Sequence, residues 1–283
     1  MRLFILGLGY SARHFVARFG DTFSHIAGTM RDPAKREAIA GIEMHSFCGS
    51  RPADETIERI SDADVLLISI PPGSSGDPAI AALDDVLATG HQRKIVYLST
   101  IGVYGDHGGA WVDESTQPQA TLDRTRMRLT AEQAWTEVAR GDAAILRLAG
   151  IYGPGRNALV TLRAGTARRI IKPGQFFNRI HVGDIAAAIM AAVRRDGGGI
   201  WNVCDDEPAP LQDVIAYAAR LMDMIPPAEE PFETAEMSAI ARSFYSSSAR
   251  VSNARLKHDL GVRLAYPNYR QGLAALWKAG EGS

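Results

Sequence analysis

The chain has 283 residues, of which 46% are hydrophobic, and its formal net charge is -1. This length suffices for one large α/β domain, or for a domain with a smaller appendage. The balanced charge gives no basic footprint for nucleic acid or for an anionic membrane surface, so we expect neither as a partner. The longest apolar stretches, 65–71 and 185–193, are too short to span a bilayer, and we expect a soluble, cytoplasmic protein.

Short apolar runs alternate with amphipathic helical patterns along the first half of the chain. The expected strands are Leu3–Leu6, His25–Thr29, Ile42–His45, Val65–Ile70, Lys94–Leu98 and Ala143–Leu148. The expected helices between them include Ser11–Phe19, Pro78–Leu87 and Leu122–Ala139. Continuous apolar strands are typical of parallel strands that are buried on both faces. The order predicts an α/β fold with right-handed crossovers and a doubly wound parallel sheet.

The second half of the chain is less regular. A helix at Asp184–Arg194 and a strand at Gly199–Val203 predict a return to the main sheet. Further helices are expected at Leu211–Met222, Ala235–Ser243, Asn253–Leu260 and Tyr269–Ala279. We therefore expect a main domain built from 1–150 plus about 179–205. A smaller, mainly helical lobe is expected from 151–178 plus 206–283.

A glycine-rich segment follows the first expected strand and opens a helix. It runs from Gly7 to Ala12 and has the form G-x-G-x-x-A. Gly7 permits a tight turn, Gly9 lets the backbone approach a pyrophosphate, and Ala12 lets the helix pack on the strand. The free N–H groups and the dipole at the helix start, near Tyr10 and Ser11, favour phosphate. We expect this segment to bind a dinucleotide.

The end of the second strand bears on the choice of cofactor. A NAD site normally has Asp or Glu there for the ribose 2′-hydroxyl, whereas an arginine accommodates the 2′-phosphate of NADP. Here Thr29 and Met30 are uncharged and Arg31 follows, while Asp32 is expected to start the next turn. We expect NADP rather than NAD, with Arg31 at the 2′-phosphate. The alternative is that Arg31 is a solvated loop residue.

Several motifs in the correct order resemble the NAD-dependent epimerase/dehydratase family, the extended short-chain dehydrogenases. Besides the glycine loop they are Ser99–Gly105, Arg147–Gly155, Ile180–Ile185 and Asn202–Pro208. The resemblance covers nearly the whole chain. It implies that the main domain is a Rossmann domain and that the helical lobe binds substrate. It also implies a possible homodimer that pairs helices 78–87 and 122–139.

The resemblance also implies roles for residues that follow the strands. Pro71 is expected along the adenosine side of the cofactor, and Gly150 and Ile151 near the nicotinamide amide. Ser99 or Thr100 is expected beside the nicotinamide, where its hydroxyl can bind a substrate carbonyl or hydroxyl group. Arg156 falls where the family lines its substrate pocket.

The chain departs from the family at the catalytic Tyr-x-x-x-Lys motif. Counting back from Glu132 places Arg124 and Arg128 in these two positions, which resembles an atypical, uncharacterised branch. Residues four apart share a helix face, so both side chains are expected in one pocket. Arg128 can still donate to the ribose hydroxyls, and Arg124 can bind an anion, but a guanidinium cannot pass a proton. The alternative is that both lie on an outer face, with Arg128 paired to Glu132.

An enzyme with this sequence needs another proton donor. Tyr104 is the best substitute, because its loop follows the strand that carries Ser99 and Thr100. The alternative is that the Tyr104 ring packs beneath that loop. His181 is expected to be a hydrogen-bonded structural residue, and no motif for a metal site is present.

Two functions are compatible with these features. We favour an NADP-dependent oxidoreductase or epimerase-like enzyme for a small polar or anionic substrate, because Ser99, Thr100, the Gly-Pro-Gly loop and the lobe are retained. The alternative is a catalytically inactive NADP-binding sensor, which the loss of Tyr and Lys favours.

Overall fold

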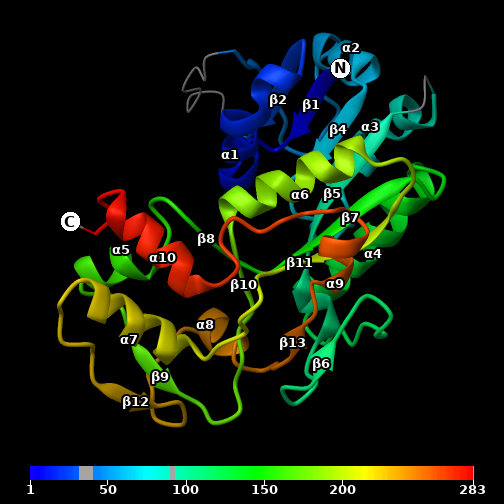
Figure 1. The fold of residues 1–283 in the computed structure, drawn as a ribbon. Helices are drawn as coiled ribbons and strands as arrows, with labels where there is room; N and C mark the ends of the chain where they lie inside the picture. Colours follow the sequence, from blue (N-terminus) through cyan, green and yellow to red (C-terminus); the bar gives the residue numbers. More distant parts are fainter. Residues whose placement is uncertain (32–40, 90–92, 283) are drawn as a thin grey trace.

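The computed structural model describes residues 1–31, 41–89 and 93–282. Its centre is a seven-stranded sheet in the order β11-β7-β5-β4-β1-β2-β3 (Figure 1). All neighbouring strands in this sheet are parallel. The strands are β1 (Arg2–Leu6), β2 (His25–Met30), β3 (Glu43–Ser46), β4 (Val65–Ile68), β5 (Lys94–Thr100), β7 (Ala143–Leu148) and β11 (Gly199–Val203). The expected doubly wound parallel sheet is therefore confirmed.

Both faces of the sheet are buried, which explains the continuous apolar strands. Along β1, Leu3 and Ile5 join one hydrophobic cluster, whereas Phe4 and Leu6 join the other. Each strand contributes to both clusters because its successive side chains point to opposite faces. Helices cover each cluster. One face carries α1 (Tyr10–Phe19) and α6 (Val182–Arg194), and the other carries α2 (Asp54–Asp62), α3 (Pro78–Ala88) and α4 (Asp123–Val138).

The order of the strands fixes where a ligand can bind. The chain builds β1, β2 and β3 in one direction and then returns to place β4 on the other side of β1. At such a switch point the loops after neighbouring strands separate and leave a crevice at their carboxyl ends. The loops that follow β1 and β4 carry Gly7 and Pro71, so two expected cofactor residues meet there.

A third hydrophobic cluster lies outside the sheet. It joins α5 (Ala158–Arg163), α7 (Leu211–Leu221) and α10 (Tyr269–Lys278), which group together in Figure 1. The structure also has three short parallel strand pairs: β8 (Gly150–Tyr152) with β10 (Arg179–His181), β9 (Arg169–Ile171) with β12 (Glu229–Pro231), and β6 (Trp111–Val112) with β13 (Arg250–Val251). The short helix α8 (Ala239–Ser243) also lies outside the sheet, whereas α9 (Ala254–His258) packs on β11 and adds Leu256 to the cluster that α1 and α6 cover.

The sequence located the strands of the main sheet and most helices to within a few residues, whereas the short strands outside it (β6, β8, β9, β10, β12 and β13) were not predicted. Helix α2 was not predicted, although Asp54 and Glu55 in its first turn favour a helix start. Helix α8 begins at Ala239 rather than at Ala235. Within the described ranges, every helix falls short of the length and apolar character needed to cross a bilayer.

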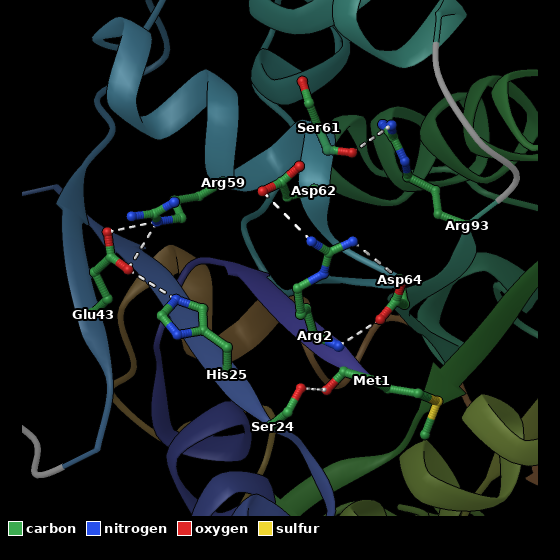
Figure 2. A network of polar contacts seen from close by, with 10 residues as sticks. All are labelled: Met1, Arg2, Ser24, His25, Glu43, Arg59, Ser61, Asp62, Asp64 and Arg93. Atoms are coloured by element: carbon green, nitrogen blue, oxygen red, sulfur yellow. Dashed lines mark hydrogen bonds and ion pairs between the residues drawn. The ribbon is translucent and has the colours of Figure 1, made fainter.

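The amino edge of the sheet is closed by a polar network (Figure 2). His25 Nε2 lies 2.8 Å from Glu43 Oε2, and Arg59 Nε donates to the same carboxylate. The backbone N–H of Arg2 donates to Asp64 Oδ2 at 2.7 Å. These contacts tie together the starts of neighbouring strands, at the end of the sheet opposite to the glycine loop. We therefore read this edge as structural.

Candidate functional site

The glycine loop has the geometry of a tight turn that needs glycine at its first position. Gly7 has φ +93°, and its N–H donates to Thr29 Oγ1 at 3.0 Å. A Cβ on Gly7 would lie 2.5 Å from Ile70 Cγ2, so no larger residue fits without a shift of the β4 loop. Behind the turn, Ser11 and Ala12 are buried, which allows α1 to pack closely on the sheet.

Glycine at position 9 is explained by a ligand rather than by the packing of the protein. It precedes α1 with φ -86°, a conformation open to any residue, and a Cβ there would meet no atom of the described residues within 4 Å. The fold therefore does not require glycine at this position. A pyrophosphate at the helix start does, because its oxygens must approach the free N–H groups closely. The residues present thus fit a dinucleotide.

Tyr10 links the glycine loop to the Gly-Pro-Gly turn. Its hydroxyl donates to the carbonyl oxygen of Pro154 at 2.9 Å, and the guanidinium of Arg156 lies 5.8 Å from its ring centroid. Arg156 is thereby placed beside the dinucleotide loop, nearer to the cofactor site than the sequence indicated.

Arg31 is exposed and directly follows β2, as a residue that reads the 2′ position requires. Asp32, expected to start the next turn, lies outside the described residues. A second guanidinium approaches the same strand end: Arg13 donates from Nε to Leu8 O at 3.3 Å, and its Nη2 lies 3.9 Å from Met30 Sδ. Sequence analysis missed Arg13, although its position four residues after Gly9 in the first turns of α1 could have indicated it.

A cavity of about 500 Å³ lies at the carboxyl ends of β5 and β7. The expected site residues that line it are Pro71, Thr100, Arg124, Arg128 and Gly150. Both arginines therefore lie on the cavity side of α4, as their four-residue spacing indicated. The outer-face alternative is wrong, and Glu132 pairs with Arg147 rather than with Arg128.

Arg128 is the more deeply placed of the two arginines. Its Nη1 donates to Leu98 O and to the Tyr97 hydroxyl, each at 3.0 Å. These contacts hold the half-buried guanidinium against β5 while it remains in the cavity wall. Burial raises the pKa of Tyr97 to about 12, so this phenol stays protonated and acts here as an acceptor.

Arg124 lies at the cavity mouth, where it meets α8. Its Nη1 donates to Ser243 Oγ at 3.0 Å, and its guanidinium lies 5.0 Å from the ring centroid of Phe244. Ser243 and Phe244 also line the cavity. Sequence analysis missed both residues, because a contact between positions 119 apart leaves no local pattern.

Ser99 and Thr100 are separated by the geometry of β5. Thr100 lines the cavity, whereas Ser99 is buried and donates through Oγ to Glu132 Oε1. Glu132 also forms a buried ion pair with Arg147, with Nη2 and Oε2 2.7 Å apart. Consecutive strand residues point to opposite faces, so only one of this pair can face the cavity. The expectation of a direct substrate contact is corrected for Ser99.

Tyr104 does not face the cavity. The 3₁₀ turn Ile101–Tyr104 directs its ring inward, where it is 1% exposed, and its hydroxyl donates to Asn202 Oδ1 at 2.8 Å. Burial raises the pKa of Tyr104 despite the Arg147 guanidinium 5.0 Å from its ring. A phenol that is buried, hydrogen-bonded and has a raised pKa is a poor proton donor for this cavity, so the expectation for Tyr104 is corrected.

His181 has a structural position. It precedes α6, where its Nδ1 accepts the Gly183 N–H at 3.1 Å, and its ring packs between Tyr152 and Tyr266. Burial lowers the pKa of His181 to about 4. Among the described residues that line the 500 Å³ cavity there is no Tyr, His, Cys, Lys, Asp or Glu. This wall therefore offers no group that titrates near neutral pH.

Ile151 and Arg156 line a second cavity of about 390 Å³. It adjoins the first cavity at Gly150, Phe177 and Asn178, which line both. Arg124 and Arg156 therefore face different cavities. Both were expected to bind substrate, and their separation does not support a shared contact with one anionic group.

No protein-family model matches the chain. The chain is 48% identical to a functionally unknown conserved protein from Silicibacter pomeroyi, whose solved structure it matches with a TM-score of 0.90 over 99% of both chains. It is also 26% identical to Protein YeeZ from Escherichia coli K12, over 93% of this chain and 96% of that protein.

More distant solved structures share the fold. The human epimerase family protein SDR39U1, solved with NADPH, is 15% identical, with a TM-score of 0.74 over 98% of this chain and 99% of its own. MoeE5, solved with UDP-glucuronic acid and NAD, is 18% identical, with a TM-score of 0.77 over 97% of both chains. At such identities the likeness concerns the fold.

Proposed function

We propose, from the premise that the chain has the fold of NAD-dependent epimerase/dehydratase proteins, that it is a dinucleotide-dependent oxidoreductase or epimerase-like enzyme for a small anionic substrate. The observation that carries the proposal is the placement of Arg124 and Arg128 in one cavity with Thr100 and Gly150. The division into a Rossmann domain and a substrate lobe belongs to the same proposal.

The cofactor is proposed to be NADP rather than NAD. Gly7 and Gly9 would hold the pyrophosphate, with Pro71 and Gly150 along its course toward the cavity. Arg31, exposed after β2, would pair with the 2′-phosphate, and Arg13 adds positive charge at the same strand end. Among proteins of this fold, SDR39U1 was solved with NADPH and MoeE5 with NAD, so the fold itself accepts either nucleotide.

The residues of the cavity would act by orientation and charge. A bound nicotinamide supplies or accepts a hydride. Arg128, fixed by Leu98 O, would donate to the nicotinamide ribose hydroxyls, and Thr100 would bind the reacting oxygen of the substrate. Arg124 would bind the anionic group, and preorganised donors of this kind stabilise charge that develops in a transition state. The proton would come from solvent, because no lining group titrates near neutral pH.

A sensor that binds NADP without turnover is the second candidate, favoured by that lack of a titratable lining group. A screen of anionic metabolites with NADPH present separates the two candidates, if ligand binding and cofactor oxidation are followed independently. Oxidation driven by one metabolite supports the enzyme. Because an epimerase returns its cofactor to the starting redox state, conversion of each metabolite is followed as well. Binding of both NADPH and an anion, without cofactor oxidation and without conversion of any metabolite that binds, supports the sensor.

A homodimer through α3 and α4 is a further proposal that the family resemblance supports. The exposed face of α4 includes Arg126, Gln133 and Glu137, so such an interface would be polar. Sedimentation equilibrium tests it directly, because a dimer doubles the mass of the 30.6 kDa chain.

A further inference from the structure

The 500 Å³ cavity combines two positively charged residues with a largely apolar wall. Its charged lining residues in the described chain are Arg124 and Arg128, both cations, and no carboxylate accompanies them. The remaining wall is largely apolar, and its aromatic members are Phe176, Phe177 and Phe244. The cavity therefore favours a ligand that has one anionic group and is otherwise apolar.

Helix α8 supplies the link between these two properties. Ser243 Oγ donates to Ile240 O at 2.6 Å, which leaves its lone pairs to accept from Arg124 Nη1. Phe244 packs on the same guanidinium and is nevertheless 56% exposed. A large aromatic side chain held at a cavity mouth gains free energy when a ligand covers it. Arg124 is thus oriented beside an aromatic ring that keeps more than half of its surface exposed.

We propose that the substrate is an aromatic monocarboxylate. Its carboxylate would bind Arg124, and its ring would pack against Phe244 and Phe177, with Ser243 as a positioning residue for the guanidinium. This inference rests on the proposed function, because it concerns the same cavity. A nucleotide sugar fits less well: with Arg128 assigned to the cofactor ribose, Arg124 is the cation left among the described residues of this cavity lining to meet a diphosphate. The nicotinamide would also occupy part of this cavity, which leaves less volume for a nucleotide sugar.

The test measures the dissociation constants of matched probes by calorimetry, with the protein saturated with NADPH. The aromatic carboxylates are cinnamate, hydrocinnamate and benzoate. Cinnamamide removes the charge, hexanoate removes the ring, and UDP-glucose represents the nucleotide sugars. At least one aromatic carboxylate is expected to bind at least tenfold more tightly than its neutral or aliphatic counterpart, and more tightly than UDP-glucose.

Variants test the preference for the ring and the preference for the carboxylate separately. Phe244→Ala should bring the affinity for the aromatic acid close to that for hexanoate. Ser243→Ala should weaken all carboxylates by a similar factor, because it acts through Arg124, and should leave cinnamamide unchanged. Ile240→Ala is the matched control: Ile240 is on the same helix and 70% exposed, but it does not line the cavity. It should change none of these constants.

The outcomes separate this inference from the proposed function. Equal binding of hexanoate and the aromatic acids, tighter binding of UDP-glucose, or no binding of any aromatic carboxylate overturns the inference. A normal preference for aromatic acids, with no cofactor oxidation by any acid, supports the inference and counts against the enzyme. Oxidation driven only by aliphatic anions supports the enzyme and overturns the inference.

Discussion

Arg128 Nη1 donates to the carbonyl oxygen of Leu98 at 3.0 Å, and this bond joins α4 to the carboxyl end of β5. The bond directs the Arg128 guanidinium into the wall of the cavity. Arg124, one helical turn earlier, consequently lies on the same side and reaches the mouth. The two arginines should therefore affect different ligands.

Substitution of each arginine should separate cofactor binding from anion binding. Arg128→Ala should weaken NADPH, because its guanidinium is the one held near the expected ribose site. Arg124→Ala should weaken a carboxylate or phosphate ligand by about 1.5–3 kcal/mol, the scale of a charge-assisted hydrogen bond, with NADPH affinity changed by no more than a few-fold. Titrations of NADPH and of the anion measure both effects. If neither variant alters either affinity, this cavity is not the ligand site.

Arg31→Ala should lower the affinity for NADPH by about 1.5–3 kcal/mol, because it removes a guanidinium from the 2′-phosphate. It should leave NADH almost unchanged, since NADH has a hydroxyl group there. Fluorescence titration with both nucleotides checks the prediction, and Arg51→Ala, another exposed arginine, is a control. Equal affinities for NADPH and NADH in the parent protein would remove the basis of the assignment.

Gly9→Val should abolish binding of both nucleotides and leave the fold intact. The new side chain meets no atom of the described residues close to its Cβ, but it occupies the space that a pyrophosphate needs. Gly7→Val is the contrast: its Cβ would lie 2.5 Å from Ile70 Cγ2 in a left-handed conformation, so this variant should be destabilised. Circular dichroism and nucleotide titration together distinguish the two. A folded Gly9→Val protein that still binds would place the site elsewhere.

Arg147→Met should destabilise the protein by about 3–5 kcal/mol, because it leaves the Glu132 carboxylate buried without its partner. The side chains of this pair are 3% and 4% exposed. Arg51→Met breaks the pair with Asp85, whose side chains are 54% and 63% exposed, and should cost less than about 1 kcal/mol. Urea unfolding measures both. Similar losses in the two variants would contradict the role given to burial.

The stability of the protein should fall between about pH 6.5 and pH 4, in part because of His181. Burial lowers the pKa of its ring to about 4, so the unfolded chain takes up this proton first as the pH falls. The stabilisation by the neutral ring is fully present above the unfolded pKa of about 6.5 and is lost as the pH approaches 4. His181→Asn, which keeps an acceptor for the Gly183 N–H, should flatten this dependence. The same slope in wild type and variant would contradict the assignment.

The sequence by itself determined the parallel sheet and the dinucleotide loop, because both depend on local order. Apolar runs of strand length predict strands that are buried on both faces. Gly7 is required by the tight turn and Gly9 by the close approach of a pyrophosphate, and both lie within one short segment. The expected strand 199–203 was likewise found as β11.

Only the tertiary structure decided the arrangement of the cavity. The helical period places Arg124 and Arg128 on one face, but the packing of Ala131 and Trp135 against the sheet decides which way that face points. The pleat of β5 sends Thr100 to the cavity and Ser99 to Glu132, and a 3₁₀ turn buries Tyr104. Helix α8 reaches the mouth through a contact with α4 that is distant in the chain. Such relationships depend on contacts between particular residues of distant elements, and these contacts leave no periodic pattern in a sequence.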